Sequence, residues 1–144
     1  MTPELRRELL ADHARRRVGF REPASTGEWQ EARLRSATCG DDVTIRLAVE
    51  DGVVVQVEWH GIGCEVSQAS ASMLAELVPG RPLEDLPALV GQVQALVDGP
   101  EGAEAPELAD AEALAGVGRF PLRGRCALLA WRALTAASGA AGPR

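Results

Sequence analysis

Three cysteines and one nearby carboxylate are the side chains of this sequence best suited to chemistry. Cys39, Cys64 and Cys126 are the chain's only cysteines, and Asp41 stands two positions after the first of them. An odd number of widely spaced cysteines does not suit a disulfide framework, so metal binding and thiol chemistry are the reactive alternatives. The residue types alone leave a third interpretation equally open, in which each cysteine is a small buried apolar side chain.

The residues that the chain lacks exclude several classes of enzyme. All fifteen basic residues are arginine, which removes the phosphate-binding lysine of P-loop proteins and every Schiff-base lysine. Tyrosine is also absent, and histidine occurs only at positions 13 and 60, so few side chains can exchange protons near neutral pH. Any reaction must therefore depend on cysteine, carboxylate or arginine.

The two histidines and the serines around position 70 receive structural interpretations. His60 is expected to be a polar residue at a strand end, and a spare metal ligand is the less favoured alternative. His13 is expected at the surface or facing a partner, without a ligand role. Ser67, Ser70 and Ser72 have no base and orienting acid beside them in the sequence, so they are interpreted as capping and packing residues.

Length and composition favour a single folded domain. We expect one domain over residues 1–137 and a flexible tail over residues 138–144, because 144 residues suit one domain of ordinary size. No apolar run approaches the roughly 20 residues of a membrane span, and the charged N-terminal segment does not resemble a secretory signal. We therefore expect a cytoplasmic protein without a membrane role. The net charge of −6 argues against nucleic acid as a partner.

The first half of the chain predicts one helix followed by three strands. Thr2 and Pro3 suit the start of a helix over residues 3–17, and a short strand is expected at 31–37. Asp51-Gly52 is a hairpin turn signal between two longer strands. Alternation places one set of apolar residues on one face of each long strand: Val43, Ile45, Leu47 and Val49, then Val53, Val55, Val57 and Trp59.

The second half predicts helices that carry two of the cysteines. After a glycine-rich turn, a helix rich in small residues begins near Cys64, and another helix covers residues 81–99. An acidic loop at 100–107 and a short helix lead to a last helix at 122–136, which contains Cys126. Helix N-termini stabilise thiolates, so both cysteines have suitable positions. Three large side chains are expected in the core: Trp59, Met73 and Trp131.

The segments around the cysteines resemble the sulfur-handling IscU/SufU family. They read CGD, GIGCEVSQASASML and RCALLAW, in that order, and the second is long enough to be specific. The similarity extends from ELLADHARR to FPLRGRCALLAWRAL and leaves out only the acidic loop and the tail. The resemblance implies an α+β fold, with a three-stranded, mostly antiparallel sheet, helices packed on one side and a metal at one exposed end.

Within this family the sequence is more similar to the SufU type than to the IscU type. Scaffolds of the IscU type usually carry histidine just before the third cysteine, where this chain has Arg125. The segment DGPEGAEAPE between Cys64 and Cys126 also resembles the longer insertion of the SufU type. Two loops depart from the family pattern: SAT replaces the usual Asn-Pro before the first CGD, and RRRVGF replaces Asn-Pro-Arg after the first helix.

The resemblance implies a tetrahedral zinc site with four ligands: Cys39, Asp41, Cys64 and Cys126. Three thiolates and one carboxylate are suitable ligands for Zn²⁺, and together with the ion they leave a formal charge of about −2. Cations must lie nearby if such a charge is partly buried. Arg123 and Arg125 are placed in the sequence to offset it.

The resemblance further implies a function in iron–sulfur cluster assembly. Cys39 would accept persulfide sulfur from a SufS-type cysteine desulfurase for downstream assembly proteins, so the chain would be a zinc-dependent sulfurtransferase. To attack, Cys39 must leave the zinc, and the family implies that a histidine of the desulfurase replaces it. The alternative is an IscU-type scaffold that assembles an iron–sulfur cluster on the same cysteines. A purely structural zinc domain is less favoured, because no C-x-x-C pair is present.

Overall fold

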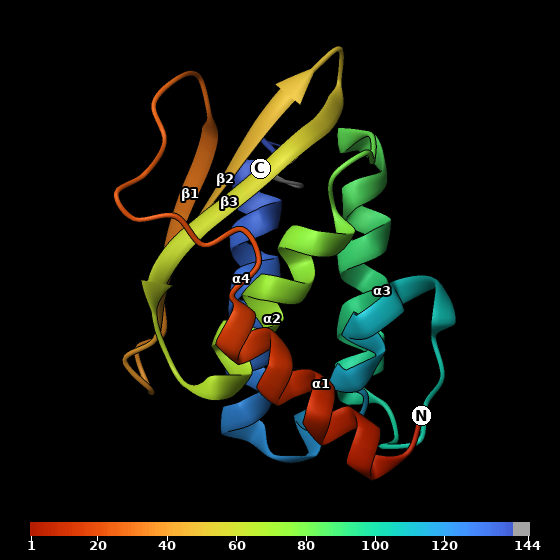
Figure 1. Ribbon diagram of the computed structural model, residues 1–144. Coiled ribbons are helices and arrows are strands. Elements are labelled where there is room, and N and C mark those ends of the chain that lie inside the picture. Colours follow the sequence, from red (N-terminus) through yellow and green to blue (C-terminus); the bar gives the residue numbers. More distant parts are fainter. Residues whose placement is uncertain (140–144) are drawn as a thin grey trace.

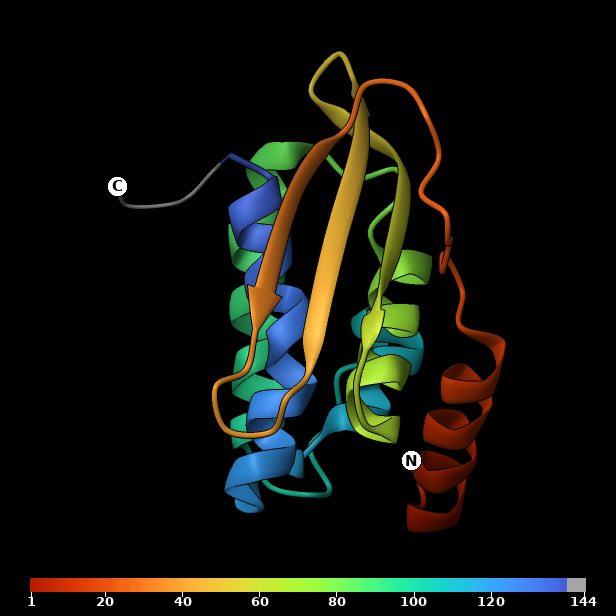
Figure 2. The same cartoon turned by 90° about the vertical axis from the view of Figure 1, so that its left-hand side faces the viewer.

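A three-stranded antiparallel sheet with helices on one side dominates the computed structural model, which describes residues 1–139 of the chain. The sheet has the order β1–β2–β3; α2 and α4 pack against it, while α1 packs on α2 and α3 on α4 (Figure 1 and Figure 2). The predicted α+β fold is therefore confirmed. The elements are α1 (Pro3–Arg16), β1 (Gln30–Arg35), β2 (Asp42–Glu50), β3 (Val53–Ile62), α2 (Glu65–Leu77), α3 (Leu86–Asp98) and α4 (Pro121–Ala137), with short 3-10 helices η1 (Leu83–Asp85), η2 (Pro106–Leu114) and η3 (Val117–Arg119).

Helix α1 is bounded by capping residues at both ends. The Oγ1 atom of Thr2 accepts a hydrogen bond from the Leu5 N–H at 3.1 Å, and Pro3 occupies the first turn, as predicted. At the other end, Arg17 adopts a left-handed conformation with φ 46° and donates its N–H to the His13 carbonyl. The helix therefore ends one residue before the predicted end.

The hairpin of β2 and β3 turns where the sequence predicts. Asp51 and Gly52 have positive φ angles of 51° and 77°, which suit a two-residue turn between twisted strands. On β2, three of the four predicted inward residues, Val43, Ile45 and Leu47, are buried, and the fourth, Val49, is partly buried against the core. The local signals of this segment are therefore sufficient to place the hairpin.

The predicted alternation on β3 is wrong at its beginning. Val54 is fully buried, while Val55 is 45% exposed, so the two residues face opposite to the prediction. The strand pairing gives the reason, because Ala48 pairs with Gln56 but the next residue, Val49, pairs with Val54. The extra residue in β3 forms a β-bulge, which reverses the alternation between the turn and the middle of the strand.

Helices α2 and α4 meet at a buried serine. The Oγ of Ser70 donates a hydrogen bond to the Ala127 carbonyl at 2.6 Å and accepts one from Trp131 Nε1 at 2.9 Å. Ser70 and Trp131 have no exposed surface, and Trp59 and Met73 are each 1% exposed. The predicted core positions of both tryptophans and the methionine are confirmed, as is the packing role of this serine.

The loop between α1 and β1 covers part of the outer face of the sheet. There Glu58 accepts hydrogen bonds from the Ser25 N–H at 2.9 Å and from Arg46 Nη1 at 2.6 Å, while Arg46 stacks 4.8 Å from the Trp29 ring centre. Burial opposes ionisation of Glu58, but the bonds from Ser25 and Arg46 outweigh it and hold its pKa below the usual value. These buried charges fix the loop against the sheet.

The segment between α3 and α4 begins as the predicted loop and continues as 3-10 helix. The short helix η2 begins at Pro106, inside the segment predicted as an acidic loop. Glu101 fixes the loop to its surroundings, because its carboxylate pairs with Arg6 at 3.1 Å and also with Arg119. Gly116 has φ 73° and lies against the backbone of Glu101, where a side chain would overlap it.

The chain after α4 is described only at its beginning. Ser138 caps α4 and donates its hydroxyl to the Thr135 carbonyl at 2.7 Å. Residues 140–144, which make up most of the predicted tail, lie outside the described residues. The domain boundary at 137 stays a prediction. Within residues 1–139, no helix is both long and apolar enough to cross a membrane.

Replacing Ser70 with alanine should destabilise the fold. The change leaves the buried Trp131 Nε1–H without its acceptor, which should cost about 2 kcal/mol of unfolding free energy and about 4–8 °C in Tm. Thermal unfolding followed by circular dichroism would measure the shift. Ser67→Ala is the matched control, because the Ser67 hydroxyl bonds the Cys64 carbonyl at a more exposed position and its loss should change Tm little. Equal melting of the Ser70 variant and the parent would contradict the role of this serine.

Candidate metal centre

The three cysteines and Asp41 meet at one end of the sheet, although they come from three separate segments. Cys39 and Asp41 lie between β1 and β2, Cys64 is the N-cap of α2, and Cys126 lies in the second turn of α4. The Sγ atoms of Cys39 and Cys126 are 3.6 Å apart, and Cys64 Sγ lies 3.8 Å from Asp41 Oδ2. Donor atoms of Cys39, Asp41 and Cys126 all lie within 4.8 Å of one another. The structure thus brings the four predicted ligands together.

A tight turn directs Cys39 and Asp41 toward the same point. The Ser36 N–H donates to the Asp41 carbonyl at 2.8 Å, and the Gly40 N–H donates to the Ser36 carbonyl at 3.3 Å. Gly40, between the two candidate ligands, has φ 75°, a conformation that residues with a Cβ adopt only at a cost. The turn therefore favours glycine in the middle of the CGD motif.

Two glycines near the end of β3 leave space for the backbone of β2 and for the Asp41 side chain. A Cβ on Gly61, where φ is 150°, would overlap the Asp42 carbonyl of the neighbouring strand. A Cβ on Gly63 would overlap Ser67 Oγ and lie 3.1 Å from Asp41 Cγ. Gly61 therefore allows β2 and β3 to approach closely, and Gly63 allows Asp41 to lie directly against the connection between β3 and α2.

Burial differs strongly among the four side chains. Cys126 and Asp41 are only 3% and 4% exposed, whereas Cys39 is half-buried and Cys64 is exposed. Burial raises the pKa of the Cys126 thiol well above its ordinary value, and the neighbouring Asp41, Cys64 and Cys39 raise it further. Cys126 is therefore a neutral thiol unless a cation lies beside it.

The donor types and the closest sulfur–sulfur distance are compatible with a tetrahedral zinc ion, although Cys64 is not among the three residues whose donor atoms all lie within 4.8 Å of one another. Zn–S bonds of about 2.3 Å at tetrahedral angles place two ligating sulfur atoms about 3.8 Å apart. The Sγ–Sγ distance of 3.6 Å between Cys39 and Cys126 is close to that value. Three thiols and one carboxylate also suit the preference of Zn²⁺ for sulfur. Thiolates bind iron in iron–sulfur clusters as well, so the donor types are compatible with both metals.

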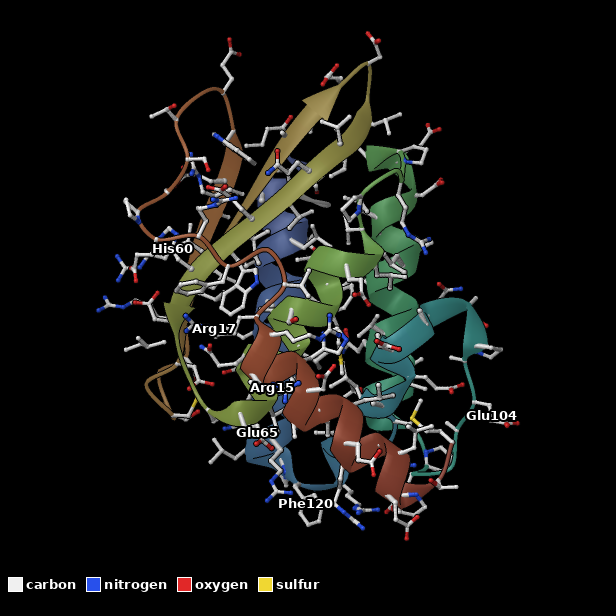
Figure 3. The ribbon with its side chains drawn as sticks, in the orientation of Figure 1. Arg15, Arg17, His60, Glu65, Glu104 and Phe120 are labelled. Atoms are coloured by element: carbon white, nitrogen blue, oxygen red, sulfur yellow. The ribbon has the colours of Figure 1, made fainter. Side chains whose placement is uncertain are left out.

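A solvent-open cavity of about 850 Å³ gives access to these donors. Its walls include Arg7 from α1 and Leu122 and Arg123 from α4, beside the three cysteines. Glu65 at the start of α2 and Phe120 before α4 lie at the same end of the molecule (Figure 3). The candidate site is therefore open to a partner and bordered by both cationic and apolar side chains.

Of the two arginines predicted to offset the charge of the site, the structure places one, Arg123, at the cavity. Arg123 lines the cavity, as its predicted role requires, whereas Arg125 is exposed on α4 and is not among the lining residues. The supporting role of Arg125 stays a prediction. The sequence reasoning missed Arg7, which shares one face of α1 with Leu10 and Ala11 at helical spacing. That face could be assigned to the site only once the packing of α1 was known.

The neighbours of His60 in the structure are residues of the sheet and the loop before it, not the cysteines. His60 pairs with Thr44 across the sheet and lines a polar surface pocket with Glu22, Arg33 and Asp42. Figure 3 shows His60 beside β3, away from Glu65 at the start of α2. His60 is not among the residues that line the cavity of the cysteines. This position agrees with the prediction of a polar strand residue.

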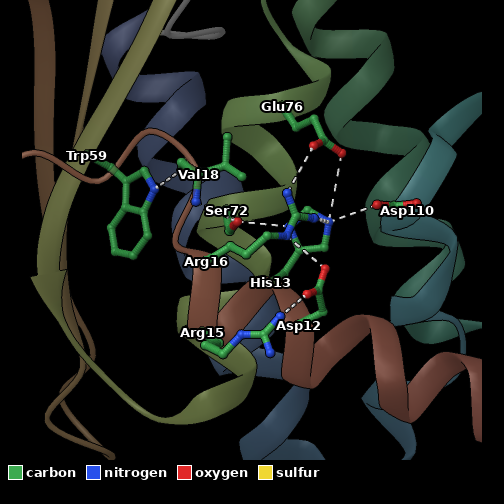
Figure 4. A network of polar contacts seen from close by, with 9 residues as sticks. All are labelled: Asp12, His13, Arg15, Arg16, Val18, Trp59, Ser72, Glu76 and Asp110. Carbon is green, nitrogen blue, oxygen red and sulfur yellow. Dashed lines mark hydrogen bonds and ion pairs between the residues drawn. The ribbon is translucent and has the colours of Figure 1, made fainter.

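The predicted surface position of His13 is wrong, because its side chain is fully buried. Its Nδ1 lies 2.8 Å from Ser72 Oγ and its Nε2 lies 2.9 Å from Asp110 Oδ2 (Figure 4). Ser72 thus has an imidazole and a carboxylate within reach, which the sequence did not reveal because Asp110 is far away in the chain. Ser72 is itself fully buried, however, and its Oγ also accepts the Val18 N–H at 2.9 Å, so its predicted packing role is supported.

Comparison with known proteins agrees with this geometry. Residues 11–127 match the family described as "NifU-like N terminal domain". A Streptococcus pyogenes serotype M1 protein named "Iron-sulfur cluster assembly scaffold protein IscU" is 34% identical over 129 residues, which cover 88% of this chain and 77% of the relative. The "Zinc-dependent sulfurtransferase SufU" of Bacillus subtilis strain 168 is 30% identical over 133 residues, covering 90% of this chain and 86% of the relative.

A solved structure supports the same conclusion. The crystal structure of a hypothetical protein matches with a TM-score of 0.82 and 32% identity, covering 96% of this chain and 99% of the other. The fold, the family match over the cysteine motifs and the named relatives all agree with the IscU/SufU resemblance. The chain therefore belongs to the NifU-like N-terminal domain family, whose similar members include iron–sulfur cluster assembly proteins of the IscU and SufU types.

Proposed function

We propose that this protein is a zinc-dependent sulfurtransferase of iron–sulfur cluster assembly, which accepts persulfide sulfur on Cys39 from a SufS-type cysteine desulfurase. The observation that carries the proposal is the meeting of three thiols and a buried carboxylate at an open cavity. Similarity to the Bacillus subtilis protein named a zinc-dependent sulfurtransferase supports the same activity. Downstream assembly proteins then receive the sulfur.

Cys39 is the acceptor because its position allows it to move. It lies in a turn outside regular structure, and its backbone N–H donates a hydrogen bond of 3.3 Å to Ser36 Oγ. Cys126 is buried within α4, and Cys64, although more exposed than Cys39, begins α2 and lies against Asp41. Cys39 is therefore the thiol whose backbone can move toward a partner with the least change to the helices.

The transfer step conserves electrons and needs no external oxidant. The Cys39 thiolate attacks the outer sulfur of a persulfide on the desulfurase, and a new S–S bond forms on Cys39. The S–S bond of the donor breaks, and the donor cysteine leaves as a thiolate with the bonding electron pair. Arg7 and Arg123 at the cavity are placed to attract the anionic persulfide.

Cys64, Cys126 and Asp41 hold the metal in this proposal, together with Cys39 at rest. A bound Zn²⁺ would stabilise the thiolate form of these cysteines and link the β1–β2 turn to α2 and α4. Asp41 is nearly buried, so its carboxylate needs a cation or hydrogen-bond donors more than an exposed carboxylate does. The three residues position the turn that carries the acceptor.

An iron–sulfur scaffold is the second candidate function. The 34% identity to the Streptococcus pyogenes protein named a scaffold favours it, and on this view a cluster is cargo assembled on the three cysteines. Arg125 favours the sulfurtransferase, since IscU-type scaffolds usually carry histidine at that position.

Metal analysis of protein purified without added metal separates the two functions. We expect about one zinc per chain and no visible absorption, because three thiolates with one carboxylate close a tetrahedral site. A brown protein that contains iron and acid-labile sulfide would overturn the sulfurtransferase in favour of the scaffold.

Gly63→Ala should weaken zinc binding by about tenfold, an effect typical of groups that orient a ligand. The added Cβ would displace the Ser67 hydroxyl and press on Asp41 Cγ, moving the carboxylate from the other donors. Competition with a chromophoric chelator would measure the affinity. Gly91→Ala in α3 is the control, because a Cβ there meets nothing within 4 Å. An affinity unchanged by Gly63→Ala would argue against Asp41 as a ligand.

Cys39→Ala should fold, keep its metal more weakly and still dock, but should no longer stimulate cysteine turnover by the desulfurase. Alanine production by the desulfurase would measure stimulation, and Thr38→Ala in the same exposed turn is the control. Mass spectrometry of the parent after turnover should find the mass of one added sulfur on the Cys39 peptide. Normal stimulation by the variant, or added sulfur on Cys64 or Cys126 instead, would show that Cys39 is not the acceptor.

A further inference from the structure

The buried side chain of His13 faces two carboxylates that the proposed sulfur chemistry does not use. His13 comes from α1, Glu76 from α2 and Asp110 from η2, and their ligand-type atoms lie within 4.8 Å of one another (Figure 4). His13 Nε2 is 2.9 Å from Asp110 Oδ2 and 3.8 Å from Glu76 Oε1. The cluster therefore joins three elements around one imidazole nitrogen.

We propose that His13, Glu76 and Asp110 form a second metal site, which binds a divalent first-row transition-metal ion through nitrogen and oxygen. Imidazole with carboxylates suits such ions, whereas the cysteine site offers mainly sulfur. Metal–ligand bonds of about 2.1 Å place neighbouring ligand atoms about 3.0–3.4 Å apart. The distances from His13 Nε2 to Asp110 Oδ2, 2.9 Å, and to Glu76 Oε1, 3.8 Å, lie on either side of this range. A small shift of Glu76 completes the approach of all three donors.

The inner side of the imidazole is already oriented for this role. Ser72 Oγ, fixed by the Val18 N–H at 2.9 Å, can also accept the Nδ1 proton of His13 across 2.8 Å. A metal-bound histidine usually donates its other ring N–H to such a partner, which fixes the ring and leaves the second nitrogen free. In this tautomer Nε2 and Asp110 present two lone pairs to each other, so a cation between them is favourable.

The outer side of the cluster is open and has excess negative charge. The side chains of Glu76 and Asp110 are 44% and 37% exposed, so an ion can reach them from solvent. Arg16 is the cation now nearest, but its contacts to His13 Nε2 and Glu76 are 3.4 Å and 3.8 Å, longer than strong hydrogen bonds. Its Nε is held instead by Asp12 at 2.7 Å, so Arg16 can remain with Asp12 when an ion enters.

Cobalt binding to the protein as purified, without a polyhistidine tag and with its cysteine-site metal in place, tests the proposal. Calorimetry should find one additional Co²⁺ per chain. Glu76→Gln combined with Asp110→Asn should weaken that binding by at least about tenfold, because two of the three ligands become poor donors. The control removes two exposed carboxylates elsewhere, with Glu84→Gln and Glu104→Gln, and should retain the parent affinity.

Two spectra locate the ion. Bound Co²⁺ should show no near-ultraviolet thiolate-to-cobalt absorption, because the site contains no sulfur. Since the chain has two histidines, His60→Gln assigns the remaining imidazole NMR signals to His13, and these should broaden strongly on cobalt binding. No additional equivalent, equal affinity in the double variant, thiolate absorption, or broadening of the His60 signals alone would overturn the second site. None of these outcomes depends on which metal or function belongs to the cysteine site.

Discussion

The hydrogen bond from Ser70 to the Ala127 carbonyl is the contact on which the geometry of the cysteine site depends. Ala127 directly follows Cys126 in α4, and Ser70 lies less than two turns after Cys64 at the start of α2. Because Ser70 also accepts the Trp131 Nε1–H one turn further along α4, the register of the two helices is fixed at two points. The separation of the two helix-bound cysteines follows from that register, and the turn that carries Cys39 must adapt to it.

Charge is the second constraint on the site. Asp41 and Cys126 are almost fully buried beside each other, and two anions so placed are unfavourable unless a cation lies between them. The protein has a net charge of −6, yet arginines at positions 7 and 123 line the cavity. Arginine pairs readily with anions, so in the proposed function these side chains would attract an anionic sulfur donor. The cations that offset the thiolates therefore also suit the proposed substrate.

Local sequence signals were sufficient wherever the structure depends on neighbouring residues. Thr2 with Pro3 predicted the start of α1, and Asp51-Gly52 predicted the hairpin. The bulge near Val55 could not be predicted, because an extra residue on one strand becomes visible only in its pairing with the other.

In the site, too, residues within a motif could be identified from the sequence, whereas residues whose position depends on distant contacts could not. Its four candidate ligands were identified through the family motifs, and the fold places them together. Arg7 and the burial of His13 were missed because both depend on how α1 is oriented. That orientation depends on the packing of α1 against α2 and on contacts with Glu101 and Asp110, nearly one hundred positions away in the sequence. A pattern within α1 contains no information about them.

Helix α2 supports both clusters because two of its serines face opposite neighbours. Ser70 and Ser72 are two residues apart, so they point about 200° apart around the helix. Ser70 contacts α4 beside Cys126, whereas Ser72 contacts His13 and the start of the loop after α1. One rigid element thus orients the sulfur-rich candidate site on one side and the proposed nitrogen–oxygen site on the other. Since thiolates prefer softer metals than carboxylates do, the two proposed sites would differ in the ions that they favour.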